Sequence, residues 1–414
     1  MTRTLPILIV LLAAGMCRGE GVKELPPAQS ACVARIDKAL ARAGEYLLDA
    51  QSDDGAWYSR QYGALKTGPT MTPYVLSSLL FMPQTGEPGR KAFNRGVGFL
   101  LKPLRRDGSL DIGPRELIYP VYTAAMASRI VAHPKPSSPS GRQGQLAWLD
   151  YLRRRQLAEP LGWQPSDADY GGWGYSIGPP EKPEEGGIAG PFHRANLSAT
   201  TFTVAAFRSA GIPSDDPVYR QALVFIERCQ NFGEGPFNDG GFFFMPEDAA
   251  QNKAGVAGVD ETGQVRFRSY GTMTADGLRC LVRCGLPPEN PRVVAARRWL
   301  MRNFSATENP GAFPPDRRIL QNATYYYWVW ALAHAMLAVR SPTLETDASD
   351  VDWPTLLADT LIRQQCADGT WRNRYTDAKE DDPLVATPWA AAALAICRAM
   401  ITRDFEGCRA SPNR

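Results

Sequence analysis

The sequence predicts an all-helical protein in which about twelve helices form a closed ring of two concentric layers. Two observations support this prediction: a short turn motif recurs six times along the chain, and the segments between its copies alternate between two kinds of helix. Recurrence of one motif along a chain indicates an architecture built from one supersecondary unit. We expect the ring to occupy residues 30–402, between an N-terminal leader and a C-terminal tail, residues 403–414.

The first nineteen residues have the layout of a secretory signal peptide. A positive charge at Arg3 precedes an apolar run that ends at Met16, and small residues follow before Glu20. The run is shorter than the roughly 20 apolar residues that a membrane span needs. Cleavage near Gly19 would give an exported protein, periplasmic or extracellular, and a lipid anchor on Cys17 is the alternative. No transmembrane span is expected elsewhere.

The composition is that of an ordinary globular protein with a sizeable core. Of the 414 residues, 44% are hydrophobic and 21% are charged. The net charge of +3 is small for this length and predicts no nucleic-acid partner. The eight cysteines follow no disulfide-framework spacing, and Cys280 and Cys284 stand four residues apart on one helix, where a disulfide rarely fits. We expect mostly buried free thiols.

The repeated motif is the end of a helix followed by Asp-Gly or Gly-Gly and then by an aromatic or apolar residue. Glycine ends a helix at little cost because it adopts the left-handed conformation, and aspartate before it favours a turn. A glutamine at the helix end can bond carbonyl groups that the last turn leaves open. The motif therefore predicts a structural staple between two helices. Its copies are Gln51 to Trp57, Gln365 to Trp371, Asp169 to Tyr175, Asn238 to Phe243 and, more weakly, Arg106 to Leu110 and Asn309 to Phe313.

The segments between the copies are of two kinds. Amphipathic helices are expected from Val33 to Leu47 and at 91–102, 143–156, 217–230, 291–303 and 353–366, whereas helices apolar nearly all round are expected at 72–82, 119–132, 197–210, 270–284, 324–339 and 386–401. A helix that is apolar all round is buried, and one with a polar stripe faces solvent. The alternation therefore predicts an outer and an inner layer, and closing the ring removes the need for terminal caps.

The Gln-x-x-Asp-Gly-x-Trp motif, or QW motif, resembles the repeat shared by squalene–hopene cyclases, oxidosqualene cyclases and protein prenyltransferase β subunits. Gln51 to Trp57 and Gln365 to Trp371 carry it in full. The resemblance covers nearly the whole chain after the leader and includes the prenyltransferase and squalene oxidase repeat proteins. It implies an (α/α)6 toroid with a central cavity, open at the end where the inner helices begin.

Residues near the start of the inner helices are expected to line this cavity. They share polar or aromatic side chains, which together would form an aromatic pocket with a polar rim. The alternative for any Ser, Thr or Asn among them is capping of the helix end. The expected cavity-lining residues are Tyr119, Tyr122, Tyr270, Thr274, Tyr325, Tyr326 and Trp389.

The acid that the resemblance implies for a terpene cyclase is missing. Class II cyclases protonate an alkene with an Asp-x-Asp-Asp run, and this sequence has none. The nearest carboxylates that could face the cavity are Asp382, before the last inner helix, and Asp276, within another. Both are catalytic candidates, and a solvated acidic loop is the alternative for Asp382.

A zinc site of the prenyltransferase kind has the right residue types in the wrong spacing. Asp276 and Cys280 lie four residues apart on one inner helix and His334 lies on the next, far from its start. We therefore predict no metal and no cofactor, with these three residues as weak candidates. Glycosidases on helical toroids need two carboxylates roughly 5–10 Å apart, and acids are scarce here.

The sequence therefore predicts architecture more sharply than activity. The favoured hypothesis is an exported scaffold that binds an apolar or isoprenoid-like small molecule, or a protein partner, in or on the ring. The alternatives are a terpene cyclase or isomerase with a relocated carboxylate and a polysaccharide-active toroid enzyme, so the question of catalysis stays open. Two long loops, residues 160–195 and 245–268, are expected to act as partial lids over the mouth.

Overall fold

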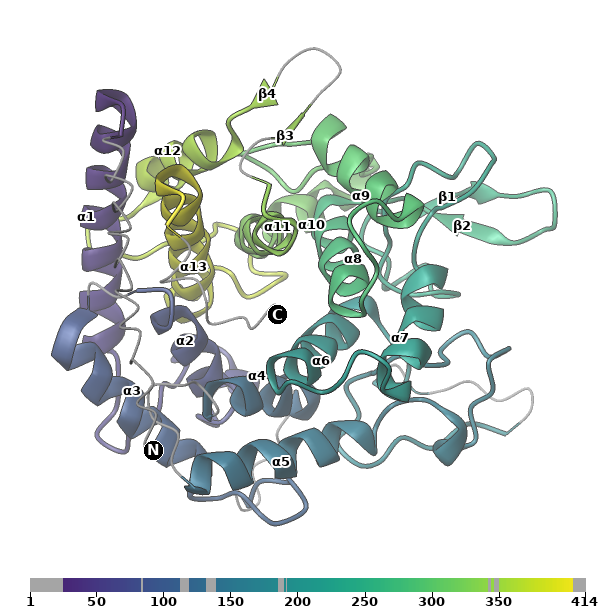
Figure 1. Ribbon diagram of the computed structural model, residues 1–414, viewed down its shortest axis with the longest axis horizontal. Helices are drawn as coiled ribbons and strands as arrows, with labels where there is room; N and C mark the ends of the chain where they lie inside the picture. Colours follow the sequence, from purple (N-terminus) through teal and green to yellow (C-terminus); the bar gives the residue numbers. More distant parts are fainter. Residues whose placement is uncertain are drawn as a thin grey trace, which may run out of the picture.

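Two concentric layers of helices form a closed ring in the computed structural model (Figure 1). The structure describes residues 25–82, 85–111, 119–131, 139–184, 190, 192–341, 344–345 and 350–404. The expected leader, residues 1–19 with Cys17, and residues 405–414 of the expected tail lie outside the described residues.

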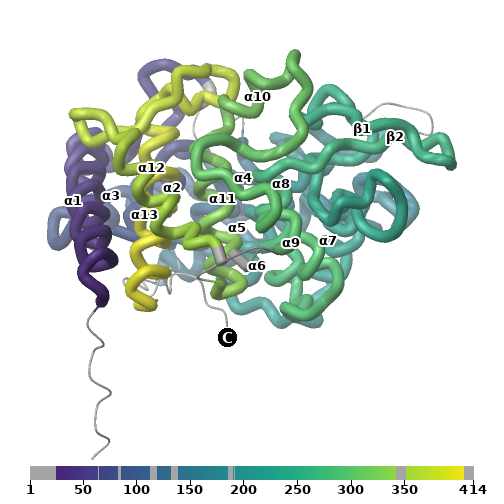
Figure 2. The backbone as a smooth tube through the Cα atoms, turned by 90° about the horizontal axis from the view of Figure 1, so that it is seen from above, coloured from purple at the N-terminus to yellow at the C-terminus, as the bar shows by residue number. Residues whose placement is uncertain are grey.

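Within the described ranges, six helices form the outer layer and six the inner layer. The outer helices are α1 (Pro27–Asp49), α3 (Gly86–Leu101), α5 (Pro139–Arg153), α7 (Pro217–Arg228), α9 (Pro291–Arg302) and α12 (Trp353–Gln364). The inner helices are α2 (Met71–Leu79), α4 (Pro120–Val131), α6 (Leu197–Ser209), α8 (Gly271–Arg283), α11 (Tyr325–Val339) and α13 (Pro383–Thr402). Each inner helix packs on the next, and α13 packs on both α1 and α2, which closes the ring. Figure 2, turned by 90°, shows the helices standing side by side.

Short elements connect or decorate the ring. They are the 3-10 turns η1 (Gly63–Leu65), η3 (Glu159–Leu161) and η4 (Pro315–Arg317), helix α10 (Arg318–Ala323), the pair β1 (Val256–Val259) and β2 (Val265–Phe267), and the pair β3 (Leu344–Glu345) and β4 (Asp350–Val351). Both strand pairs are antiparallel, and in the first Val256 pairs with Phe267. The β1–β2 hairpin projects outward from the ring (Figure 1), so this part of the 245–268 loop does not cover the mouth.

The inner layer is buried as its composition predicts. Almost every residue of α6, α8 and α11 is buried, whereas the outer helices bury one face. Within the described residues, α13 alone is long and apolar enough to cross a membrane, and 89% of its most apolar window is buried inside the protein, as in the core helix of a folded domain. The six described cysteines form no disulfide among themselves, and five of them are buried.

The glutamine of the turn motif joins neighbouring repeats. Gln51 Nε2 donates to the carbonyl of Gly55 in its own turn (2.9 Å) and to the carbonyl of Ala92 in the next outer helix (2.8 Å). Gln365 makes the same two bonds, to Gly369 (2.9 Å) and to Ala39 of α1 (2.8 Å). The bond to Ala39 connects the last outer helix, α12, to the first, α1. Equivalent pairs of bonds are made by Gln156 and Gln230. The motif therefore fastens one repeat to the next, where we had expected it only to complete its own helix end.

The aromatic residue of the motif is held from both sides. Trp57 is fully buried, and its Nε1 donates to the Leu47 carbonyl of the preceding outer helix (2.7 Å). Its backbone N–H donates to the Thr72 hydroxyl of the following inner helix (3.2 Å). The same threonine bond recurs at Thr200, Thr274 and Thr387. Gly55 has a φ of +92°, and a Cβ there would lie 2.6 Å from the Arg95 carbonyl oxygen, so only glycine fits the turn.

The two weaker copies of the motif are joined differently. Leu104 and Leu110 form an isolated antiparallel bridge around the Arg106 to Leu110 turn. At the fifth copy, Asn309 replaces the glutamine clamp: its Oδ1 accepts from the Thr272 backbone N–H (3.0 Å), and its Nδ2 donates to the Thr324 hydroxyl (2.8 Å). The copies of the motif that depart from the consensus sequence are thus joined to their neighbours by different backbone and side-chain hydrogen bonds.

Candidate functional site

A cavity of about 240 Å³ lies at the end of the ring where the inner helices begin. Five of the six inner helices supply side chains to its wall, and α8 supplies none. The helices contribute Met71, Tyr74, Tyr122, Met126, Ser198, Phe202, Tyr327, Val385 and Trp389, and the connecting segments contribute Leu65, Thr70, Tyr119, Tyr175, Ala378 and Lys379. We call this space the mouth cavity. Tyr175 comes from the 160–195 loop, so that loop does reach the mouth.

One side of the mouth cavity is a stack of rings from three inner helices. Tyr327 and Trp389 are stacked with their centroids 5.0 Å apart and their planes inclined by 22°. Tyr74 meets Trp389 edge to face at 5.3 Å, and its hydroxyl donates to the Val385 carbonyl (2.7 Å). These contacts hold the rings in place before any ligand arrives.

The opposite side is a cluster of three tyrosines. Tyr122 and Tyr175 are stacked at 5.5 Å, and their hydroxyl oxygens lie 3.3 Å apart. Tyr119 meets both rings edge to face, at 6.1 and 5.9 Å. The mouth cavity is therefore preformed, with phenol groups set among aromatic faces.

The floor of the mouth cavity is closed by aromatic rings on the ring axis. Phe202 and Trp330 are stacked at 5.4 Å with planes only 7° apart, and His334 follows 4.4 Å below Trp330. The Arg279 guanidinium lies 4.3 Å from the Trp330 ring centroid. The centre of the toroid is thus filled rather than open from end to end.

A buried carboxylate reaches the mouth cavity through one tyrosine. The Tyr327 hydroxyl donates to Asp276 Oδ2 (2.5 Å), and the Ser198 hydroxyl lies 2.5 Å from the same phenol oxygen. Asp276 is fully buried and pairs with Arg279 Nη2 (2.5 Å). Burial raises the pKa of Asp276 above its usual range, against the lowering effects of Arg279 and Tyr327. Asp276 itself does not line the mouth cavity, so its effect there passes through Tyr327.

The second acid candidate, Asp382, caps a helix. Its Oδ1 accepts from the Leu384 backbone N–H at the start of α13 (2.9 Å), and its Oδ2 accepts from the Ser59 hydroxyl. Asp382 is 3% exposed and is absent from the wall of the mouth cavity, so it is neither a solvated loop acid nor aimed at a ligand.

A third buried carboxylate, Glu380, was not among the sequence candidates. It is fully buried and accepts from the backbone N–H groups of Tyr326 (2.9 Å) and Tyr327 (2.8 Å) at the start of α11. Burial raises its pKa to about 8, although these hydrogen bonds oppose the shift. The acidic run before α13 was the signal that could have found it, because acceptors satisfy the open N–H groups of a helix start.

The structure separates the residues expected to line the cavity into two groups. Tyr119, Tyr122 and Trp389 line the mouth cavity. Tyr270, Thr274, Tyr325 and Tyr326 do not: Tyr270 packs on Phe313, Thr274 accepts from the Phe242 backbone, Tyr325 donates to the Ala306 carbonyl, and Tyr326 packs on Tyr325.

The position of each residue around the helix axis explains which α11 side chains line the mouth cavity. Tyr327, Trp330 and His334 lie three and four residues apart and therefore share the face towards the ring axis. Tyr325 and Trp328 lie on another face, where they bond Ala306 and Ser305 of the outer wall. Counting seven residues, about two helical turns, back from His334 would have selected Tyr327 ahead of its two neighbours.

The three metal-ligand candidates do not gather into a site. Asp276 is occupied by Arg279 and Tyr327, Cys280 Sγ lies 3.4 Å from the Thr201 hydroxyl, and His334 Nδ1 lies 2.9 Å from the Trp330 carbonyl. Across the described ranges, no three His, Cys, Asp or Glu side chains are grouped as metal ligands.

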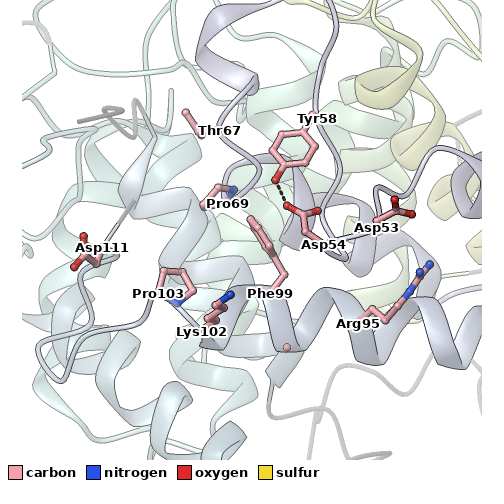
Figure 3. A pocket seen from close by; sticks show the side chains of 11 residues that line it. Asp53, Asp54, Tyr58, Thr67, Pro69, Arg95, Phe99, Lys102, Pro103 and Asp111 are labelled. Atoms are coloured by element: carbon pink, nitrogen blue, oxygen red, sulfur yellow. Dashed lines mark hydrogen bonds between the residues drawn. The ribbon is translucent and has the colours of Figure 1, made fainter. Parts of the chain in front are cut away.

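A second pocket, of about 670 Å³, lies on the outer side of the ring between the first turn motif and α3 (Figure 3). Tyr58 meets Phe99 edge to face at 6.4 Å, and its hydroxyl donates to Asp54. Two of the charged groups around it bond to other residues: Arg95 donates to Gln51, and Asp111 pairs with Arg105 (3.0 Å). This pocket is therefore part of the outer surface around the first turn motif.

No protein-family model matches the sequence, and no curated protein is significantly similar to it. Solved structures do match. A variant of the type II terpene cyclase MstE from Scytonema, in complex with geranylgeranyl dihydroxybenzoate, superimposes with a TM-score of 0.52 at 14% identity, covering 90% of this chain and 99% of that one. The cellobiose 2-epimerase from Spirochaeta thermophila superimposes with a TM-score of 0.57 at 13% identity, covering 92% and 100%. The chain is an α/α toroid. At sequence identities this low, the structural match shows a shared fold and nothing about activity. The two matched enzymes catalyse different reactions on that fold.

Proposed function

We propose that this toroid is a binding scaffold that takes one small, largely apolar molecule with a polar group into the mouth cavity. The observation that supports this most is the wall itself: preformed aromatic faces with phenol groups, and no carboxylate among those lining residues that the structure describes. Such a wall suits an apolar ring or a short isoprenoid whose hydroxyl or carbonyl oxygen meets Tyr119, Ser198 or Lys379.

The volume limits the size of the ligand. Pockets for drug-sized ligands measure roughly 300–1,000 Å³, and the mouth cavity holds about 240 Å³ above a closed aromatic floor. A geranylgeranyl chain joined to an aromatic ring, as named for the MstE complex, is too large to be enclosed here. A monocyclic terpenoid or a simple phenol is of suitable size.

An isomerase or cyclase activity is the second candidate, and one contact favours it. Tyr327 is the lining residue that bonds a buried carboxylate, Asp276, so a proton could pass between a ligand and the phenol oxygen. Asp276 would then be a positioning residue. Asp382 has no part in this candidate because it caps α13. A polysaccharide-active site gains no support, since it needs two carboxylates facing the substrate.

The proposal can be tested by filling the mouth cavity. Met126 is 7% exposed and lines the wall, so Met126→Trp should occupy the space, while Leu146→Trp on the exposed face of α5 adds the same ring outside it. Calorimetric titration with a monocyclic monoterpenoid alcohol should show saturable binding to wild type and Leu146→Trp, and none to Met126→Trp. Circular dichroism checks that both variants fold. Equal binding by the two variants would contradict the proposal.

The enzyme alternative has its own readout. Wild type incubated with linear monoterpenoids, squalene and cellobiose should return each compound unchanged by mass spectrometry if the protein only binds. A cyclised or isomerised product that is lost in Asp276→Asn and Tyr327→Phe, but kept in Asp382→Asn, would establish the alternative.

A further inference from the structure

A cluster of three arginines lies at the end of the ring opposite the mouth. Arg129 is in the last turn of α4, and Arg279 and Arg283 are in the second half of α8. Arg279 is 2% exposed, Arg283 is 6% exposed, and Arg129 is half-buried. Burial, and then the charges of Arg279 and Arg129, lower the pKa of Arg283, which reflects how closely the three positive groups approach one another.

This arginine cluster carries more positive charge than its protein partners neutralise. Among the described residues, Asp276 is the one carboxylate that pairs with it, through Arg279. Burial, and then the arginines, lower the pKa of His334 well below its usual range, so this neighbour is neutral and adds no charge. The carbonyl ends of α4 and α8 offset part of the excess, since a helix C-terminus favours cations. Three positive groups still face one negative group.

The hydrogen-bond donors of the cluster are also underused. Arg129 Nε donates to the Ser209 hydroxyl (3.2 Å), and no other bond to a described residue is made by this guanidinium. Arg279 Nε is buried without a partner. Arg283 makes no hydrogen bond to any residue in the described part of the chain. A guanidinium nitrogen that is buried without an acceptor, as Arg279 Nε is, is unfavourable, so an acceptor from outside the chain would be stabilised here.

A small enclosed space lies against this cluster. It measures about 20 Å³ and is lined by Arg129, His334, Ser77 and apolar side chains that include Phe202 and Trp330. Arg279 lies within 4.3 and 5.7 Å of the Trp330 and Phe202 ring centroids, so its charge adjoins the same space. Phe202 and Met126 line both this space and the mouth cavity and separate the two. The volume suffices for one particle of about the size of a water molecule.

We propose that this space binds one small inorganic anion of the size of chloride, held by arginine N–H groups at the narrow end of the toroid. The charge excess favours an anion over water, and the volume excludes carboxylates with a carbon chain. His334 would be a wall and not a donor, because the Trp330 carbonyl takes its Nδ1 hydrogen. The site is separate from the mouth cavity, so it can exist whether or not the function proposed above is correct.

Thermal unfolding in sodium chloride and in sodium gluconate at equal ionic strength tests the site. Gluconate is too large for the space, so a melting temperature that rises by a few degrees and saturates in chloride alone is expected. Arg129→Gln should weaken chloride binding about tenfold or more. Arg298→Gln, on the exposed face of α9, removes the same charge elsewhere and should keep the wild-type response.

Direct observation complements the melting curves. Crystals grown with bromide should show an anomalous peak beside Arg129 in wild type, and Arg129→Lys, which keeps the charge but loses the fork of donors, covers the case in which Arg129→Gln does not fold. Equal stabilisation by chloride and gluconate, or an unchanged chloride response in both Arg129 variants, would overturn the proposal.

Discussion

The turns on the outside of the ring and the walls at its centre differ in how strictly they repeat. At four turns the same glutamine spans two repeats and the same threonine receives the aromatic residue's N–H. At the centre, the five inner helices that line the mouth cavity present different sets of side chains, such as Ser198 with Phe202 on α6 and Val385 with Trp389 on α13, and α8 presents none. Ring closure therefore depends on repetition, whereas the cavity's chemistry is free to vary from helix to helix.

A second contrast is electrical. At the staples, neutral glutamine amides and tryptophan indoles make the buried bonds to backbone carbonyls, and the charged groups that join them, such as Arg42 and Arg95, are partly or largely exposed. The centre holds buried ionisable groups, namely Asp276, Glu380 and the arginine cluster of Arg129, Arg279 and Arg283. The exterior should accordingly respond to truncation and the interior to pH and salt, and the following predictions separate the two.

The largest effect on stability is expected from removing the tryptophan side chain of a turn motif on the outside of the ring. Trp57→Ala should lower the free energy of unfolding by about 3–5 kcal/mol, because it leaves a cavity and an unpaired Leu47 carbonyl. Trp389→Ala is the matched change at the centre and should cost less, since Trp389 already borders empty space. Guanidinium denaturation followed by circular dichroism measures both. Equal losses would mean that the staples contribute nothing beyond ordinary core packing.

The pH dependence of stability should arise at the centre. Glu380 has a folded pKa of about 8 against its usual 4.5, so unfolding releases a proton between these pH values. Its contribution is complete below about pH 4.5 and is lost as the pH rises to about 8, with a slope of at most about 1.4 kcal/mol per pH unit. Melting temperatures from pH 5 to 8.5 should fall in wild type and in Gln365→Ala, and the fall should be smaller in Glu380→Gln. An unchanged slope in Glu380→Gln would show that other groups titrate instead.

The seam between the last and first outer helices should be sensitive to one glutamine. Gln365→Ala should cost about 1–3 kcal/mol, because the Ala39 and Gly369 carbonyls lose their shared donor. Gln164→Ala is the control: its side chain is exposed, and the change should stay within about 0.5 kcal/mol. Hydrogen exchange should also speed up in α1. Unchanged hydrogen-exchange protection of α1 in Gln365→Ala would show that other contacts hold the ring closed.

The smallest effect concerns a residue that the sequence suggested for the cavity. Thr274→Val should cost about 1–2 kcal/mol, because the buried Phe242 N–H loses its acceptor, and it should leave ligand affinity unchanged. Tyr327→Phe, on the wall, should change ligand affinity instead. Denaturation and calorimetric titration of both variants check the assignment. A weaker ligand affinity in Thr274→Val would contradict it.

The fold could be predicted from the sequence because its signals are local. Helix periodicity and a glycine that only a turn accommodates can be recognised within a few residues, as at Gly55. The helices expected at 270–284 and 291–303 are found as Gly271–Arg283 and Pro291–Arg302.

The site was predicted only in part because it depends on contacts between distant residues. Tyr327 meets Asp276 and Ser198 from two other helices, and no local spacing indicates that meeting. Tyr325 and Tyr326 differ from Tyr327 only by rotation about the helix axis, which decides which ring faces the centre. Asp382 resembled a free acid because the Ser59 hydroxyl that it binds lies more than 300 residues earlier.

The bond from Gln365 to Ala39 has a consequence for the order of events during synthesis. Among the helices of the ring, α1 leaves the ribosome first, yet the helices that cover it, α12 and α13, follow after all the others. Until they emerge, the inner face of α1 and one side of α2 stay open, and a nascent chain of five repeats is an arc with two apolar edges. The ring can close only after α13 has emerged, so the arc must avoid pairing with a second arc until then. The need for chaperones should therefore be greatest just before α13 emerges.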